Sequence, residues 1–263
     1  MGLVLRAPVA AALVAAAFPA WPEEAPPLAV DVPVTAAVTG AGLALWGAME
    51  LAKGELTPSS CRWCTPPALD RRVRAAVVWP DRRAAALLSD VLEFALPASL
   101  AGADFFSAGR DLRRASEDVL VAMEAVALAA AATQLAKSAV ARRRPATWAT
   151  GVRTGPEDDR AFFSGHAATA FAAAAAFGTV ARMRGYPAWP AVYAVGFGVA
   201  ATVGYLRMAA DEHWLTDVVA SAAVGTALGM AVPLLLHRSP REGSWTLAPL
   251  AGGAAGVRWV LRL

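Results

Sequence analysis

The chain has 263 residues, of which 57% are hydrophobic, and its mean hydropathy is +0.45. These values fit one helical domain of the membrane type better than an average soluble enzyme. The net charge of +3 does not indicate nucleic-acid binding, because the arginines are spread over short connections and form no basic face interleaved with aromatic residues.

The first 20 residues carry one arginine, then an apolar run and small residues, which is the pattern of a secretory signal peptide. A retained membrane anchor is the alternative. Segment 21–33 is rich in proline and is expected to be a linker. A helical run follows at 34–51, and we expect one domain over 34–238.

The only two cysteines, Cys61 and Cys64, lie in the connection that follows this run. Two cysteines without a nearby histidine cannot complete a tetrahedral zinc site. A catalytic redox pair is disfavoured because no βαβ pattern surrounds them. In an exported chain we therefore expect a local disulfide between them.

Five further apolar runs have lengths near the roughly 20 residues that cross a bilayer. They predict an all-α bundle of five to six mostly transmembrane helices. Asp90, Glu93 and Glu124 lie within two of these runs, and should face the inside of the bundle, because a carboxylate facing lipid is costly. The five runs are 84–106, 119–137, 166–183, 189–208 and 215–237.

The first of three polar clusters contains Lys137, Arg144 and Pro145. The two cations are seven residues apart, so we expect them on one face of a helix that Pro145 ends. The second cluster is Ser164-Gly165-His166, which precedes an alanine-rich run. Its serine is a natural N-cap, and the free amides of the first turn would point at an anion.

The third cluster contains Arg207, His213 and Asp217. On a helix, a spacing of four would place the carboxylate beside the imidazole, where it could fix the tautomer. The intervening Asp211 and Glu212 should point away, because an anion would oppose phosphate binding. Each cluster alone is more often a solvated helix end or a surface pair, but their ordered conjunction predicts a phosphate pocket at one end of the bundle.

This pattern resembles the type 2 phosphatidic acid phosphatase family, whose signature is K-x6-R-P, then P-S-G-H, then S-R-x5-H-x3-D. Phe163 and Leu206 depart from it, where the family has proline and serine. Neither departure removes a charged or nucleophilic group. Nine residues agree: Lys137, Arg144, Pro145, Ser164, Gly165, His166, Arg207, His213 and Asp217.

The resemblance implies phosphate-ester hydrolysis through a phosphohistidine. It makes His213 the nucleophile, Asp217 its stabilising partner and His166 the acid and base. The phosphate-binding groups would be Lys137, Arg144, Ser164, Gly165 and Arg207.

No metal or other cofactor is implied, and the expected substrate is a lipid phosphate monoester or pyrophosphate at a membrane. Two alternatives remain: a soluble periplasmic acid phosphatase, and a vanadium haloperoxidase, which fits poorly with so apolar a chain. Protein partners are not indicated.

We expect a bacterial-type inner membrane with the pocket facing the periplasm or exterior. If the signal peptide is cleaved, the chain starts outside, and three full spans before Lys137 would place the pocket in the cytoplasm. A retained anchor adds a span but starts inside, with the same outcome, so an outward pocket requires one run not to cross. The short, polar-dotted run 34–51 is the candidate. The tail 239–263 alternates apolar and charged residues on one side of a Gly-Gly pair, which predicts a small β-hairpin or a disordered tail.

Overall fold

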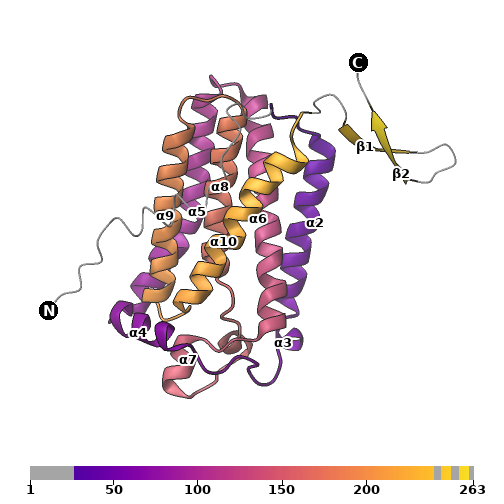
Figure 1. The fold of residues 1–263 in the computed structure, drawn as a ribbon. Helices are drawn as coiled ribbons and strands as arrows, with labels where there is room; N and C mark the ends of the chain where they lie inside the picture. The colour runs from indigo at the N-terminus through magenta and orange to yellow at the C-terminus, as the bar shows by residue number, and fades with distance from the viewer. Residues whose placement is uncertain (1–26, 240–243, 250–254, 261–263) are drawn as a thin grey trace.

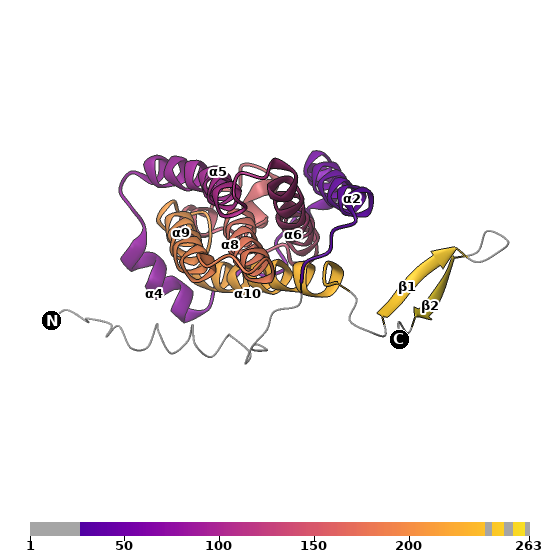
Figure 2. The same ribbon diagram turned by 90° about the horizontal axis from the view of Figure 1, so that it is seen from above.

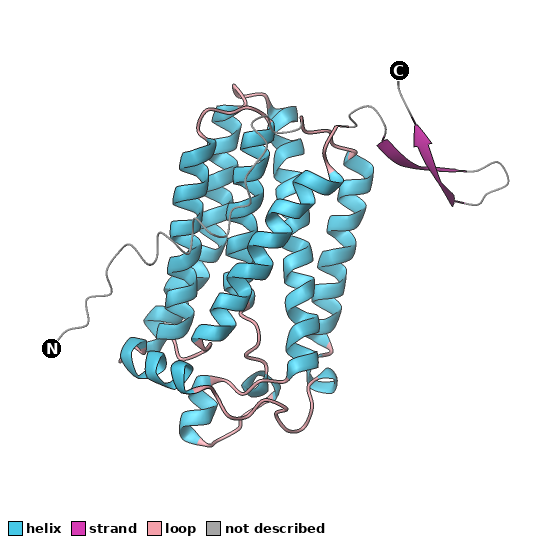
Figure 3. Cartoon of the chain, in the orientation of Figure 1, coloured by secondary structure: helices cyan, strands magenta, loops and turns pink. Residues whose placement is uncertain are grey.

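The computed structural model describes residues 27–239 and two strands, 244–249 and 255–260. The expected signal peptide and residues 21–26 of the expected linker lie outside the described residues. The described chain is an all-α bundle followed by one β-hairpin, as predicted (Figure 3).

The bundle consists of six long helices, with short helices in the connections. In chain order the elements are α2 (Val32–Leu51), α3 (Lys53–Leu56), α4 (Ala68–Val77), α5 (Arg82–Ser107), α6 (Leu112–Val140), α7 (Pro145–Thr150), the 3₁₀ turn η1 (Pro156–Asp159), α8 (Gly165–Met183), α9 (Trp189–Ala209), α10 (Leu215–Ala231), the π-helical turn η2 (Val232–Leu236), β1 (Ser244–Pro249) and β2 (Ala255–Val260).

The six long helices run side by side, and α3, α4 and α7 gather at one end of them (Figure 1). Viewed from above, α8 lies in the middle of the bundle, with α5, α6, α9 and α10 around it (Figure 2). Helix α2 lies on the outside and packs against α6 (Figure 2). The end that carries α3, α4 and α7 is called the connection end below.

Aspartates define where three of the helices begin. Asp31, Asp81 and Asp111 each accept a hydrogen bond from the backbone N–H three residues later, at 3.2, 2.9 and 3.1 Å. Such caps satisfy donors that have no partner within the helix. The apolar runs therefore start as helices at positions that the sequence itself marks.

Small residues allow α8 to occupy the centre of the bundle. Alanines fill most of its buried positions, and α10 approaches it closely through Gly225 and Gly229. A Cβ atom on these glycines would lie 2.3 and 2.5 Å from carbonyl oxygens of α8, so no larger residue fits there without a shift. This is the small-residue packing that membrane helices use in place of a hydrophobic driving force.

Five of the described helices are long and apolar enough to cross a membrane: α2, α5, α6, α9, and α10 together with η2. The protein is therefore a helical membrane protein. Run 34–51 forms α2, which is one of these five helices by length and hydropathy and lies along α6. The expectation that this run stays out of the membrane stays a prediction.

The position of α2 constrains the orientation of the whole bundle. The residues just before it bond to the far end of α10 and η2, where Ala29 N–H donates to the carbonyl of His237 at 2.7 Å. They therefore lie at the opposite end from α3, α4 and α7. If α2 crosses the membrane and the connection end faces outward, residues 27–31 lie on the cytoplasmic side. A cleaved signal peptide would place residues 27–31 outside. If α2 crosses the membrane, a cleaved signal peptide and an outward-facing connection end therefore exclude each other.

The predicted hairpin is present within the C-terminal tail. Strands β1 and β2 pair antiparallel, from Ser244 opposite Val260 to Pro249 opposite Ala255.

The carboxylate of Glu124 in α6 faces inward, as expected, and contacts His237 Nε2 at 2.6 Å.

Candidate active site

The first cluster lies at the connection end, but its two cations are on different elements. Helix α6 ends at Val140, and Ala141 adopts a left-handed conformation with φ of 47°. Arg142 forms a β-bridge with Trp63, and Arg144 is extended and precedes Pro145, the first residue of α7. The expectation of one helix carrying both Lys137 and Arg144 is therefore wrong, because the chain turns before the proline.

The second cluster caps α8 as expected. The Ser164 hydroxyl accepts from Ala167 N–H at 3.5 Å, and His166 lies in the first turn. Gly165 lies beside the first cluster, since a Cβ built on it would be 3.9 Å from the Lys137 ammonium nitrogen. The start of α8 and the end of α6 therefore meet.

Arg207 lies in the last turn of α9 and is buried. Its Nη1 atom donates to Ser89 Oγ at 3.2 Å and contacts Asp90 Oδ1 at 3.4 Å. Both partners are on α5. A hydroxyl from α5 thus lies beside this arginine, although Leu206 replaces the serine that precedes it in the family signature.

His213 is buried in the connection between α9 and α10. Its Nδ1 atom lies 2.8 Å from the carbonyl oxygen of Ala161. A carbonyl only accepts, so Nδ1 carries the proton and Nε2 is left with its lone pair. Burial lowers the pKa of His213 well below its usual range, and nearby cations, Arg144 first among them, lower it further. The ring is therefore neutral, which is the form that can attack phosphorus.

Asp217 was expected to lie beside His213 on one helix, but the two residues do not share a helix. His213 precedes α10, and the Asp217 carboxylate caps that helix by accepting from Trp214 N–H at 2.8 Å. Its distance to His213 Nδ1 is 3.7 Å. The Ala161 carbonyl, rather than this carboxylate, accepts the hydrogen bond that fixes the tautomer, and Asp217 supplies a negative charge nearby.

Arg142, which the sequence reading did not single out, holds Asp217 in place. Its guanidinium bonds the Asp217 carboxylate, and also Asp70 Oδ2 at 2.6 Å. The same guanidinium lies 3.7 Å from the ring centre of Trp63, in the cysteine connection. A cation–π contact of this kind favours a desolvated arginine. Three consecutive arginines, residues 142–144, mark this segment in the sequence. Which of them bonds Asp217 and which lies among the cations of the site depends on the turn at Ala141.

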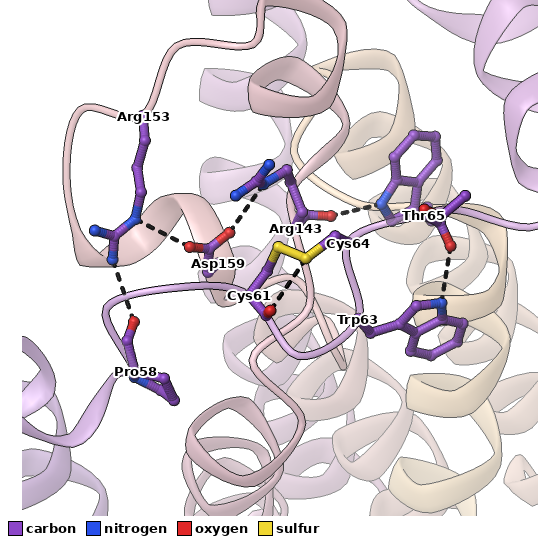
Figure 4. Close-up of a disulfide and its surroundings, with 9 residues drawn as sticks. Pro58, Cys61, Trp63, Cys64, Thr65, Arg143, Arg153 and Asp159 are labelled. Carbon is purple, nitrogen blue, oxygen red and sulfur yellow. Dashed lines mark hydrogen bonds and ion pairs between the residues drawn. A yellow bond between two sulfur atoms is a disulfide. The ribbon is translucent and has the colours of Figure 1, made fainter.

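The cysteine connection packs against the segment that carries these arginines. Cys61 and Cys64 are joined by a disulfide, with Cα atoms 5.4 Å apart (Figure 4). Arg143 N–H donates to the carbonyl of Trp63 at 3.1 Å. Arg143 and Arg153 also share the carboxylate of Asp159 (Figure 4). The disulfide therefore lies at the same end of the bundle as the site.

Two glutamates reach the cations of the site. Glu157 Oε2 accepts from Arg144 at 2.7 Å, and Glu212 contacts the same guanidinium and lies 3.8 Å from Arg207. The expectation that Glu212 points away is therefore wrong, because it bridges the first and third clusters. Asp211 does point away, toward Arg74 at 2.7 Å. Burial raises the pKa of Glu157, but the cations outweigh it and hold that pKa below its ordinary value.

Arginine donors remain available for a ligand. The Nε atoms of Arg144 and Arg207 are buried and have no hydrogen-bond partner among the described residues. An unpaired buried donor is costly, so these atoms fit a site that an anion fills. Within the same described part of the chain, no group of three or more His, Cys, Asp or Glu residues is arranged to hold a metal ion.

Comparison with known proteins agrees with this geometry. The family model of the PAP2 superfamily matches residues 118–241, which include all nine motif residues. Residues 118–241 belong to the PAP2 superfamily. This membership supports a phosphatase of the PAP2 type.

One solved structure similar to this one is that of the first transmembrane PAP2 type phosphatidylglycerolphosphate phosphatase from Bacillus subtilis. The match covers 75% of this chain and 93% of that chain, with 16% sequence identity and a TM-score of 0.47. No curated protein matched the chain.

Proposed function

We propose that this PAP2 protein hydrolyses a lipid phosphate monoester or pyrophosphate without a metal, through a phosphohistidine on His213. The observation that carries the proposal is a neutral, buried imidazole placed among arginines, in which His213 Nε2 and the Nε atoms of Arg144 and Arg207 have no hydrogen-bond partner among the residues that the structure describes. Positioned positive charge is the main source of catalysis in phosphoryl transfer.

The roles follow from the contacts. His213 Nε2 would attack phosphorus, and Asp217, held by Arg142, would stabilise the imidazolium that forms. Lys137, Arg144 and Arg207 would bind the phosphate oxygens, together with the Ser164 hydroxyl and the Gly165 amide. His166 would give a proton to the leaving alcohol and later take one from water.

A lipid substrate is favoured by the surface next to the site. Leu87, Val91 and Phe94 of α5 are between 55% and 73% exposed and flank Asp90, which contacts His166. Because α5 is a candidate membrane span, these side chains would face lipid. A headgroup could then enter the site while its tails stay in the bilayer, where each buried CH₂ contributes about 0.8 kcal/mol.

The test compares two substrates and two variants. Purified protein in mixed micelles should release phosphate from phosphatidate with a higher kcat/KM than from glycerol phosphate. His213→Ala should abolish turnover, whereas His166→Ala should still form a phosphoenzyme from a substrate with a good leaving group. Equal losses in both variants for every leaving group, with no trapped phosphoenzyme, would refute the assigned roles.

A companion test addresses the metal. Activity should survive a chelator, and vanadate should inhibit competitively, since cations of the chain supply the charge that a metal would provide. Activity that is lost to a chelator and restored by zinc or magnesium would overturn the metal-independent mechanism.

A further inference from the structure

Two carboxylates of α5 contact the second histidine of the site. His166 Nε2 lies 2.8 Å from Asp90 Oδ1 and 3.2 Å from Glu93 Oε2. Helix α5 lies outside residues 118–241, and neither carboxylate belongs to the three motif clusters. The cost of a carboxylate in lipid predicted that both face inward, but no sequence motif gave them a part in the chemistry.

These contacts decide which nitrogen of His166 can exchange a proton. An ionised carboxylate only accepts hydrogen bonds, so the proton on Nε2 is held between the ring and α5. Nδ1 makes no hydrogen bond to any residue in the described part of the chain. It is therefore the nitrogen left to serve the substrate.

A cation lies beside His166 on the same carboxylate. Asp90 Oδ1 contacts His166 Nε2 at 2.8 Å and Arg207 Nη1 at 3.4 Å. A nearby cation disfavours a positive imidazole and a contacting carboxylate favours it, so Asp90 and Glu93 oppose the effect of Arg207. Glu93 is held in position by the Thr169 hydroxyl, which donates to Oε1 at 2.8 Å, while Asp90 also contacts Arg207.

We propose that Asp90 and Glu93 are positioning residues, which fix the proton on His166 Nε2 and stabilise the imidazolium so that Nδ1 acts as acid and base. This inference rests on the proposed phosphatase function. It extends the site by one helix, and it assigns to α5 a role in proton transfer besides its place in the bundle.

The proposed step balances. As the bond from His213 Nε2 to phosphorus forms, the bond from phosphorus to the leaving oxygen breaks, and the proton on His166 Nδ1 moves to that oxygen. In the second step water gives one proton back to Nδ1 while its oxygen bonds phosphorus. The bond from phosphorus to His213 then breaks and inorganic phosphate leaves. The Nε2 proton of His166 stays in place throughout.

The test is leaving-group dependence in the full-length protein in detergent. Asp90→Asn/Glu93→Gln should lower kcat for an alkyl phosphate by roughly ten- to a hundredfold, within the range that general acid catalysis supplies. For p-nitrophenyl phosphate, which needs no protonation of its leaving group, the loss should stay below about threefold on the same basis. In a His166→Ala background the two substitutions should cause no further loss, because residues that act through one group are not additive.

Control variants separate positioning from folding. Asp104→Asn removes a carboxylate from the other end of the same helix and should leave the ratio of the two rates unchanged. Thr169→Val keeps both carboxylates and removes only the hydrogen bond to Glu93. It should lower kcat less than the double variant, and again more for the alkyl phosphate than for p-nitrophenyl phosphate. This variant tests the proposal even if the double variant fails to fold.

The outcomes distinguish the two proposals. Equal losses for both substrates, or losses that add to that of His166→Ala, would overturn the positioning role while leaving the phosphatase intact. Wild-type protein that releases no phosphate from any ester would overturn both. Unchanged leaving-group dependence in Thr169→Val and in the double variant would refute the inference alone.

Discussion

Replacing Glu212 by glutamine should tighten binding of an inorganic anion. The Glu212 carboxylate contacts Arg144 and lies 3.8 Å from Arg207, so it lies against two cations that the proposed phosphate would also engage. A phosphate has to displace this carboxylate or lie beside it. Glutamine fills nearly the same volume but carries no charge, so the substitution removes the competing anion alone.

The size of the effect follows from Coulomb's law. Two unit charges about 4 Å apart interact by about 1 kcal/mol in bulk water, and by about 4 kcal/mol at an effective dielectric constant near 20. The Glu212 side chain is one-third exposed, which favours the lower half of this range. A gain of about 1 to 2 kcal/mol corresponds to roughly five- to thirtyfold tighter binding.

Competitive inhibition by vanadate and by inorganic phosphate measures this gain. The inhibition constants of Glu212→Gln should fall relative to wild type, and the difference should shrink as salt screens the charges. Glu55→Gln is the matched control, because Glu55 is an exposed glutamate in α3 at the same end of the bundle. Unchanged or weaker inhibition in Glu212→Gln would show that this glutamate orients the arginines and does not compete with the ligand.

Three further predictions follow from the same structure. Because the pKa of His213 lies well below 6.5, the acid limb of kcat/KM should lie below that pH once substrate ionisation is corrected for; a limb above pH 6.5 would contradict a neutral nucleophile. Gly225→Ala should lower stability by about 1 to 3 kcal/mol, since the new Cβ would lie 2.3 Å from the Ala168 carbonyl oxygen; an unchanged melting temperature would argue against this close helix contact. Cys61 and Cys64 should react with a membrane-impermeant thiol reagent in intact cells only after reduction, because disulfides persist in oxidising compartments; free thiols that react only after permeabilisation would place the site in the cytoplasm.

The sequence was informative about which residues come together, and less so about how. The spacing of the three clusters predicted one site at an end of a helical bundle, because each cluster lies at the end of an apolar run. It could not predict that Ala141 ends α6, since alanine favours helix and gives no signal for a left-handed turn. The prediction that His213 and Asp217 pair on one helix was wrong for a related reason, since the spacing does not show where a helix begins. Helix α10 starts after His213, and the Asp217 carboxylate caps its first turn.

Contacts between distant segments were harder to predict. Asp90 and Glu93 were recognised as inward-facing from the cost of a carboxylate in lipid, but their partner His166 lies more than 70 residues away. Glu212 was expected to point away because an anion opposes phosphate binding, and this expectation was wrong. Its charge is attracted to the cations of the site, so it contacts Arg144 and lies 3.8 Å from Arg207.

The central position of α8 has a consequence for how the protein enters the membrane. Fourteen of its 19 residues are buried, and it is not among the helices apolar enough to cross a membrane on their own. Nine of its 19 residues are alanine, whose small side chain contributes little transfer free energy into lipid, so its insertion depends on neighbours that cover it. We therefore expect α8 to be integrated together with α9 and α10, so that the site is assembled late, when the last helix pair closes around the first turn of α8.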